Sequence, residues 1–341
     1  MTEQQEKSAR RLRTWSRFGS LRRRPTEYEV LTGQFHYDFR WEPAPFEIDP
    51  QAPINAWYLR HREQSPFQVS SWEDFRDPHA LTYRAYVTLQ HQRETYMDGL
   101  IDEFEQRDYD ETLGQQWVEF LDAAFIPARF PIHVLQMTAM YVGQMSPSAY
   151  IANPAHFQGA DELRRIQWIA YRTKALSLSH ESPENIASSH KARRAWEDGD
   201  WWQPLRKAFE TMLTAYDWGE AFTALNLVAK PIFDEWFNRA LSVLARQNGD
   251  ELLGLMCDEF ALDSDRSRAW SRALVNYAVE REPKHCRLLK DWIAKWRPLV
   301  TEGIAPLTEL EQRAPSSPAA GETLRAVIDG YDDYLHGCGL A

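Results

Sequence analysis

Hydrophobic residues recur along most of this 341-residue chain at the three- and four-residue spacing that is typical of amphipathic α-helices. The first long periodic stretch is 81–107, which follows an Asp77-Pro78 pair that resembles a helix start. Its predicted apolar face consists of Leu81, Ala85, Leu89, Tyr96, Leu100 and Phe104. Further helices are predicted over 112–145 with a bend at Pro127 and Pro131, 161–179, 204–246 with a break near Pro231, 250–261, 265–281 and 285–299. Alternating strand patterns are scarce, so the sequence predicts an all-α core.

Proline and charge divide the chain into three parts. Residues 25–70 contain six prolines among many aromatics, which excludes a long helix there, so 1–70 is predicted to be an extended arm. Residues 71–308 form one predicted helical domain. The Ser- and Pro-rich stretch within 309–321 predicts a flexible connector, which makes 309–341 a connector and tail.

The charge of the chain is unevenly distributed. The net charge is -11, but the segment 1–24 holds eight basic and two acidic side chains, which leaves -17 on the remainder. The basic arm is either a solvated tail or a segment that docks on an acidic protein, and Trp15 and Phe18 favour docking. The acidic body argues against nucleic-acid binding.

Sequence motifs for catalysis are missing. The chain contains no nucleophile elbow, phosphate-binding loop, dinucleotide fingerprint or zinc-protease motif. Glu282 and His285 have Glu-x-x-His spacing, but the proline between them predicts a corner between helices rather than a ligand pair. Asp333 and His336, near the C-terminus, have the same spacing and belong to no second matching pair. The adjacent Trp201 and Trp202 are predicted to pack in the core.

Two further observations predict the cellular location of the protein. No uninterrupted apolar stretch is long enough to cross a bilayer, and the segment 1–24 has no apolar signal region, which predicts a protein without a membrane span or secretory signal. Cys257, Cys286 and Cys338 have no metal-binding or redox spacing, which predicts reduced thiols and a cytoplasmic location.

Several stretches together resemble one family, the β subunit of the hydroxylase in bacterial multicomponent di-iron monooxygenases, closest to the four-component toluene, alkene and isoprene group. The resemblance covers about residues 13 to 300. Its motifs are Arg13-Thr14-Trp15-Ser16, Arg23-Arg24-Pro25-Thr26-Glu27-Tyr28-Glu29, Ala170-Tyr171-Arg172-Thr173, Asp217-Trp218-Gly219-Glu220-Ala221-Phe222, Leu225-Asn226-Leu227-Val228 and the Trp292–Pro298 stretch.

This resemblance implies a ferritin-like, ribonucleotide-reductase-like helical bundle with no metal site in this chain. The di-iron centre is expected in a partner α subunit, so this chain carries no cofactor. The expected assembly is a dimer of αβγ trimers with a small γ subunit, served by an effector protein, a Rieske ferredoxin and a reductase. It would oxidise hydrocarbons such as toluene, alkenes or isoprene with O2 and NADH-derived electrons, with this chain as a non-catalytic structural subunit.

The resemblance also implies altered versions of the metal-ligand positions. Arg165, after Asp161-Glu162-Leu163-Arg164, stands where the α subunit has histidine, and Lys230 stands for a carboxylate. Asp265 and Arg268 are placed at the second Glu-x-x-His motif, and the first ligand position lies near Ile132 or His133. Arginine keeps its proton and cannot serve as a nitrogen ligand. We therefore expect Glu162, Lys230 and Asp265 to form buried ion pairs with the arginines.

The arm is the expected contact with the α subunit, through Trp15, Phe18, Arg22, Arg23, Arg24, Tyr28, Phe35, Tyr37 and Trp41. Three alternatives stay open at this point. One is a stand-alone ferritin-like di-iron protein, the second is a helical interaction scaffold unrelated to oxygenases, and the third is a helical nucleic-acid binder.

Overall fold

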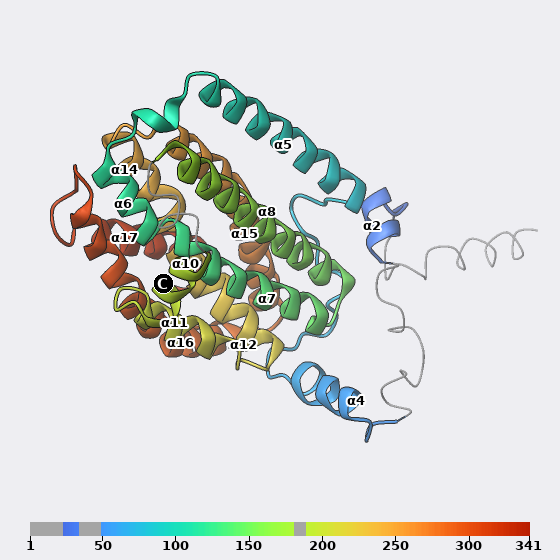
Figure 1. Cartoon of the computed structure of the whole chain (residues 1–341). Helices are drawn as coiled ribbons and strands as arrows, with labels where there is room; N and C mark the ends of the chain where they lie inside the picture. The colour runs from blue at the N-terminus through green and yellow to red at the C-terminus, as the bar shows by residue number, and fades with distance from the viewer. Residues whose placement is uncertain (1–22, 34–48, 181–188) are drawn as a thin grey trace, which may run out of the picture.

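The computed structural model describes residues 23–33, 49–180 and 189–341, and all regular structure in these ranges is helical (Figure 1). This agrees with the all-α prediction. Two short helices come first, followed by a long helix at the edge of the molecule and then by the bundle (Figure 1). In the described part of the chain these three helices are α2 (Glu27–Thr32), α4 (Pro53–Tyr58), which continues as a π-helical turn (Leu59–Glu63), and α5 (Tyr83–Glu105).

Four helical segments build the centre of the bundle. They are α7 (Arg129–Met145), α8 (Ala149–Ser179), the composite segment 218–247, and α15 (Glu251–Arg281). The composite segment consists of α12 (Trp218–Phe222), η5 (Thr223–Ala229), α13 (Lys230–Asp234), η6 (Glu235–Ala240) and α14 (Leu241–Gln247). Around this centre lie α6 (Gln115–Ala124), α10 (Ser189–Asp198), α11 (Gln203–Met212), α16 (Lys284–Leu310) and α17 (Glu322–Gly337).

Helix α5 begins later than its sequence signal. Thr82 is the N-cap and its hydroxyl accepts the backbone N–H of Ala85, whereas Asp77 accepts the backbone N–H of His79 within a turn. The prediction of a helix start at Asp77 is therefore wrong. The buried face also differs from the predicted one, because Tyr96 is exposed and its neighbour Met97 is fully buried.

The two longest helices run farther than their hydrophobic patterns predict. α8 begins at Ala149, well before position 161, and Pro154 lies inside it, in a segment that is buried on almost every side. α15 is continuous from Glu251 to Arg281, although the sequence predicts two helices there. Burial stabilises these stretches enough to outweigh the local signals.

Pro231 does not end the composite segment. Its ring nitrogen cannot donate a hydrogen bond, and the chain responds with two π-helical stretches, η5 before it and η6 a turn after it. The predicted break near Pro231 is instead a widened but continuous helix. As a result, Lys230 and Asp234, one α-turn apart on α13, both point to the bundle centre.

Aromatic side chains fill the core. Trp202 is buried and packs against the rings of Trp196 and Trp236, with ring centroids 6.0 and 6.1 Å apart. This confirms the prediction that Trp202 packs in the core. His285 also behaves as predicted, since it lies at the corner between α15 and α16, where its ring nitrogen bonds the Gln68 carbonyl oxygen at 2.7 Å.

The C-terminal segment is better ordered than its sequence predicts. α16 continues through Pro298 and Pro306 to Leu310, and α17 follows after a short loop. In α17 the side chains of Tyr331, Tyr334 and Leu335 are buried in the core. Residues 322–337 are therefore part of the helical body rather than a tail. No helix among the described residues is both long and apolar enough to cross a membrane.

Candidate functional site

Four charged side chains form a closed ring in the centre of the bundle, here called the central quartet: Glu162, Arg165, Lys230 and Asp234. The Lys230 ammonium lies 2.6 Å from Glu162 Oε1 and 2.8 Å from Asp234 Oδ2. Arg165 donates to Asp234 Oδ1 at 2.7 Å and also pairs with Glu162 Oε2. The two negative and two positive charges alternate around the ring, so the quartet is neutral overall.

The quartet is removed from water. Each of its four residues is at most 4% exposed. Burial by itself raises the pKa of Asp234, but the charges of Lys230 and Arg165 outweigh burial and hold that pKa well below its ordinary value. Burial lowers the pKa of Arg165, and the charges of Glu162 and Asp234 reverse this effect. Asp234 and Arg165 therefore keep their charges near neutral pH.

Helical spacing explains how the ring is assembled. Glu162 and Arg165 are three residues apart on α8, and Lys230 and Asp234 are four apart on α13, so each pair shares one helix face. The Arg165 guanidinium lies about 5.5 Å from the centroids of the Phe233 and Phe237 rings. Arg165 also donates to Asn238 Oδ1 at 3.3 Å, and the Ser264 hydroxyl donates to Asp234 at 2.8 Å.

A second cluster of buried charges lies beside the quartet. Arg266 bonds both Asp161 and Asp263, the latter at 3.0 Å. Asp263 in turn pairs with Arg164 at 3.1 Å and with Arg93 at 2.5 Å. Tyr86 and Gln90 from α5 each donate to Asp161 at 2.8 Å. Together these bonds tie α5, α8 and α15 to one another.

The structure corrects the predicted position of the second motif. On α15, Asp263 lines the same small cavity as Glu162 and Arg165, and Arg266, three residues on, bonds Asp161 and Asp263. Asp265 lies on the surface with a 56% exposed side chain and pairs with Arg239 at 2.9 Å. Arg268 is largely buried, but it bonds Glu235 at 2.7 Å, away from the quartet. The prediction of Asp265 in a buried central ion pair is therefore wrong by two positions.

Sequence reasoning missed Asp234, Asp263 and Arg266. Asp234 could have been found as the residue one helical turn after Lys230. For the other two residues the local signal was ambiguous, because Asp263, Asp265, Arg266 and Arg268 give two overlapping acid-x-x-Arg pairs. Only the rotation of α15 about its axis decides which of the two pairs faces inward.

A ferritin-like bundle implies a di-iron centre, and the residues of this chain do not fit one. Such a centre needs two Glu-x-x-His pairs and two further glutamates. Here the residues three positions after Glu162 and after Asp263 are the arginines Arg165 and Arg266, which have no lone pair to give, and Glu162 is already bonded to Lys230 and Arg165. The cavity between the quartet and α15 measures about 10 Å³, which is about the space of one water molecule. No group of metal-ligating side chains occurs among the described residues.

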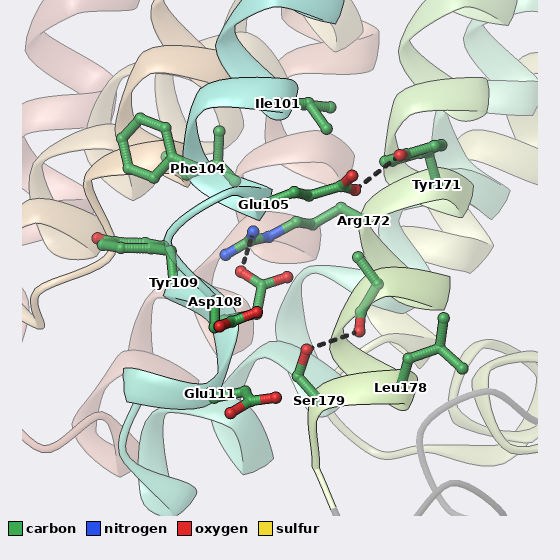
Figure 2. A pocket seen from close by; sticks show the side chains of 13 residues that line it. Ile101, Phe104, Glu105, Asp108, Tyr109, Glu111, Tyr171, Arg172, Leu178 and Ser179 are labelled. Carbon is green, nitrogen blue, oxygen red and sulfur yellow. Dashed lines mark hydrogen bonds and ion pairs between the residues drawn. The ribbon is translucent and has the colours of Figure 1, made fainter.

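A further pocket lies between the end of α5, the turn 109–112 and α8, and measures about 260 Å³ (Figure 2). Its buried cation Arg172 pairs with Asp110 there and, at 3.0 Å, with Asp250. At its rim Tyr171 donates to Glu105 at 2.7 Å (Figure 2). The charged groups are thus engaged in joining α8 to the neighbouring turn and to the start of α15.

The arm is described only in part. Tyr28 is buried against the Tyr150 ring of α8, with centroids 5.8 Å apart, so its ring is not available to another subunit. Arg23 pairs with Glu29 of its own chain at 2.9 Å, whereas the side chain of Arg24 is exposed. The remaining predicted contact residues lie outside the described residues: Trp15, Phe18, Arg22, Phe35, Tyr37 and Trp41.

Comparisons with known proteins agree with this architecture. The family model described as methane, phenol and alkene hydroxylase matches residues 57–282. The chain is 39% identical over 292 residues to the β subunit of the hydroxylase component of a toluene-4-monooxygenase system from Ectopseudomonas mendocina, covering 86% of this chain and 88% of that protein.

Two solved structures have the same fold. A chain of toluene 4-monooxygenase, solved with toluene bound in its resting active site, superposes with a TM-score of 0.82 and 38% identity, and the match covers 87% of this chain and 97% of that one. Phenol hydroxylase from Pseudomonas sp. OX1 matches with a TM-score of 0.78 at 18% identity, over 95% and 93% of the two chains. The chain therefore belongs to the methane, phenol and alkene hydroxylase family, in which it is related to a hydroxylase β subunit.

Proposed function

We propose that this chain is a structural, non-catalytic β subunit of a multicomponent hydrocarbon monooxygenase. The observation that supports the proposal is the central quartet, which fills the centre of the bundle, where di-iron members of the fold hold their metal, with a lysine and an arginine. The two cations neutralise Glu162 and Asp234 in the way that a bound metal would. The chain then keeps the ferritin-like bundle without the chemistry of an iron site.

In this proposal the oxidation takes place in a partner. A catalytic α subunit holds the di-iron centre, a small γ subunit completes the trimer, and two αβγ trimers form the hydroxylase. NADH-derived electrons arrive through a reductase and a Rieske ferredoxin, and an effector protein acts on the complex. By relation to the toluene-4-monooxygenase β subunit, the substrate class is a small hydrocarbon such as toluene, an alkene or isoprene. The three free cysteines are consistent with a cytoplasmic location.

The alternatives have less support. Family membership excludes a helical scaffold unrelated to oxygenases. A stand-alone di-iron protein would need two Glu-x-x-His pairs, and the residues three positions after Glu162 and after Asp263 are arginines. Nucleic-acid binding has little support because the body of the chain is acidic and would repel phosphates. Most of the basic arm lies outside the described residues.

The test is an iron measurement on the chain alone and on the hydroxylase assembled with its α and γ subunits. We expect less than about one iron per ten chains for the isolated subunit, and about two per α subunit in the complex. Stoichiometric iron in the isolated subunit would contradict the proposal.

A charge-neutral variant supplies the matched control. Glu162→Gln combined with Lys230→Met removes one negative and one positive charge together, so the quartet stays neutral. Assembled with α and γ, this variant is expected to show the turnover of the wild-type complex per α subunit. A loss of turnover in a fully assembled complex would show that the quartet takes part in the reaction.

A further inference from the structure

The pocket at the end of α5 is large enough for a small organic molecule. It measures about 260 Å³ and lies between α5, the turn 109–112 and the last part of α8 (Figure 2). For comparison, an apolar cavity of about 150 Å³ accommodates one benzene molecule. The pocket therefore has room for one aromatic ring with a small substituent.

Aromatic and aliphatic side chains form two walls of this pocket. Phe104 and Tyr109 lie on one side, and Tyr171 and Leu178 lie on the other (Figure 2). The rings of Phe104 and Tyr109 meet edge to face, with centroids 4.6 Å apart. On α8, Leu178 is 72% exposed and Tyr171 is 44% exposed. A ring bound between the walls would cover this apolar surface, which is the main source of affinity for a small aromatic ligand.

A buried cation supplies a donor of hydrogen bonds to the pocket. Arg172 lines the pocket and is 1% exposed. Its two terminal nitrogens pair with Asp110 and Asp250, but its Nε–H group has no acceptor in the described part of the chain. A buried donor without an acceptor costs free energy. The site therefore favours a ligand that brings an oxygen lone pair to this nitrogen.

Carboxylates surround the donor. Glu105 and Asp110 line the pocket, and an ionised carboxylate can accept several hydrogen bonds. Asp108 and Glu111 also line it, and both are exposed and form no ion pair with the described residues. The polar part of the pocket thus combines one buried donor with several acceptors.

This combination selects among classes of ligand. An anion would be repelled by the carboxylates, and a primary ammonium has no lone pair for the Nε–H of Arg172. A hydrocarbon would leave both the donor and the acceptors without a partner. A hydroxyl group satisfies both, because its oxygen accepts from Arg172 while its hydrogen is donated to a carboxylate.

We propose that this pocket binds a small neutral arene that carries one hydroxyl group, with the ring against Phe104 and Tyr109 and the oxygen at Arg172. The binding site is argued from the geometry of this chain alone. Its link to the reaction rests on the proposed function, because hydroxylation of an aromatic hydrocarbon produces molecules of this class. The ligand would then be a product of the complex.

Four probes with one ring each test the ligand class: benzyl alcohol, benzylammonium, benzoate and toluene. Isothermal titration calorimetry at pH 7 measures the binding of each probe to the full-length chain. We expect one site for benzyl alcohol with a Kd of about 1 mM or lower, and binding at least about 10-fold weaker for the other three. A chain that does not bind benzyl alcohol, or that binds any of the other probes as tightly, would overturn the inference.

Variants on α8 test the location. Replacing Arg172 would break two buried ion pairs, so the substitution is made in the wall instead. Ala175→Leu adds three carbon atoms to the pocket, whereas Ala170→Leu makes the same change at an exposed position that does not line it. We expect Ala175→Leu to weaken the binding of benzyl alcohol at least about 10-fold and Ala170→Leu to bind like the wild type, with both melting temperatures near that of the wild type. Equal affinity of Ala175→Leu and the wild type would overturn the assignment to this pocket.

The assembled hydroxylase separates this inference from the proposed function. Complexes of the wild-type chain or of Ala175→Leu with α and γ are titrated with benzyl alcohol, and we expect the wild-type complex to bind one more equivalent per β subunit. Equal stoichiometry would mean that a partner fills the pocket, and it would overturn this inference while the proposed function stands. If the chain binds benzyl alcohol alone but does not assemble with α, the proposed function and the link to a product fail, and the binding site stands.

Discussion

The ammonium nitrogen of Lys230 lies 2.6 Å from a carboxylate oxygen of Glu162, a residue 68 positions away on another helix. Neither side chain has appreciable contact with water. A buried charge is stable only when an opposite charge and sufficient hydrogen bonds accompany it, so each member of the central quartet depends on the other three.

Removing one cation of the quartet is therefore expected to be costly. Lys230→Met leaves Arg165 as the cation that pairs directly with both Glu162 and Asp234, and we expect the free energy of unfolding to fall by about 3–5 kcal/mol. Urea denaturation of the isolated subunit measures this change. The double variant Glu162→Gln with Lys230→Met is expected to recover much of the loss, and a purely additive double-mutant cycle would contradict the ring.

The surface pair of Arg239 with Asp265 provides the opposite case. Both side chains are about half exposed, at 50% and 56%, so solvent screens their attraction. Asp265→Ala is expected to change the free energy of unfolding by less than about 1 kcal/mol. If Asp265→Ala lowered the free energy of unfolding as much as Lys230→Met does in the same urea titration, the result would contradict the surface position of Asp265.

Glu311 predicts a dependence of stability on pH. This side chain is buried beside Trp236 and Thr323, and burial raises its pKa to about 7, against 4.5 for the free group. Between these two values the unfolded chain loses the proton that the folded chain keeps, so stability falls as pH rises from 4.5 to 7. The effect has an upper bound of about 3 kcal/mol.

Glu311→Gln tests this origin because glutamine keeps the hydrogen-bonding shape without titrating. Thermal unfolding at pH 5 and pH 8 is expected to show a smaller difference between the two pH values for the variant than for the wild type. An unchanged difference would assign the pH dependence to other groups.

Two glycines in long helices should respond to alanine in opposite directions. A Cβ on Gly303 of α16 would lie 2.9 Å from the Leu205 backbone of α11, whereas one on Gly99 of α5 would meet nothing within 4 Å. Gly99→Ala is expected to stabilise the chain by up to about 1 kcal/mol through helix propensity. Gly303→Ala is expected to destabilise it by about 1–3 kcal/mol, because backbone cannot move aside easily. The melting temperatures of the two variants, compared with that of the wild type, test this prediction, and a shift in the same direction for both would contradict it.

The sequence was most informative where one local pattern suffices. Helical periodicity predicted the fold class, and the spacing and resemblance of Glu162, Arg165 and Lys230 predicted three of the four central charges, which the structure brings together. The corner at His285 and the buried Trp202 also followed from neighbouring residues.

The failures have a common physical cause, which is tertiary packing that no local window contains. Two overlapping acid-x-x-Arg pairs occur on α15, and the rotation of that helix selects Asp263 over Asp265. Pro154 and Pro306 remain inside helices because the surrounding bundle stabilises them. Tyr28 is an aromatic residue of the kind that often contacts a partner, yet its ring packs against Tyr150 on α8 of its own chain.

The neutrality of the central quartet has a consequence for how the protein is made. A bundle centred on unpaired carboxylates gains stability when a metal binds them, which couples its stability to the supply of that metal. Here Lys230 and Arg165 emerge from the ribosome with the chain. We therefore expect the folding of this subunit not to depend on the supply of iron.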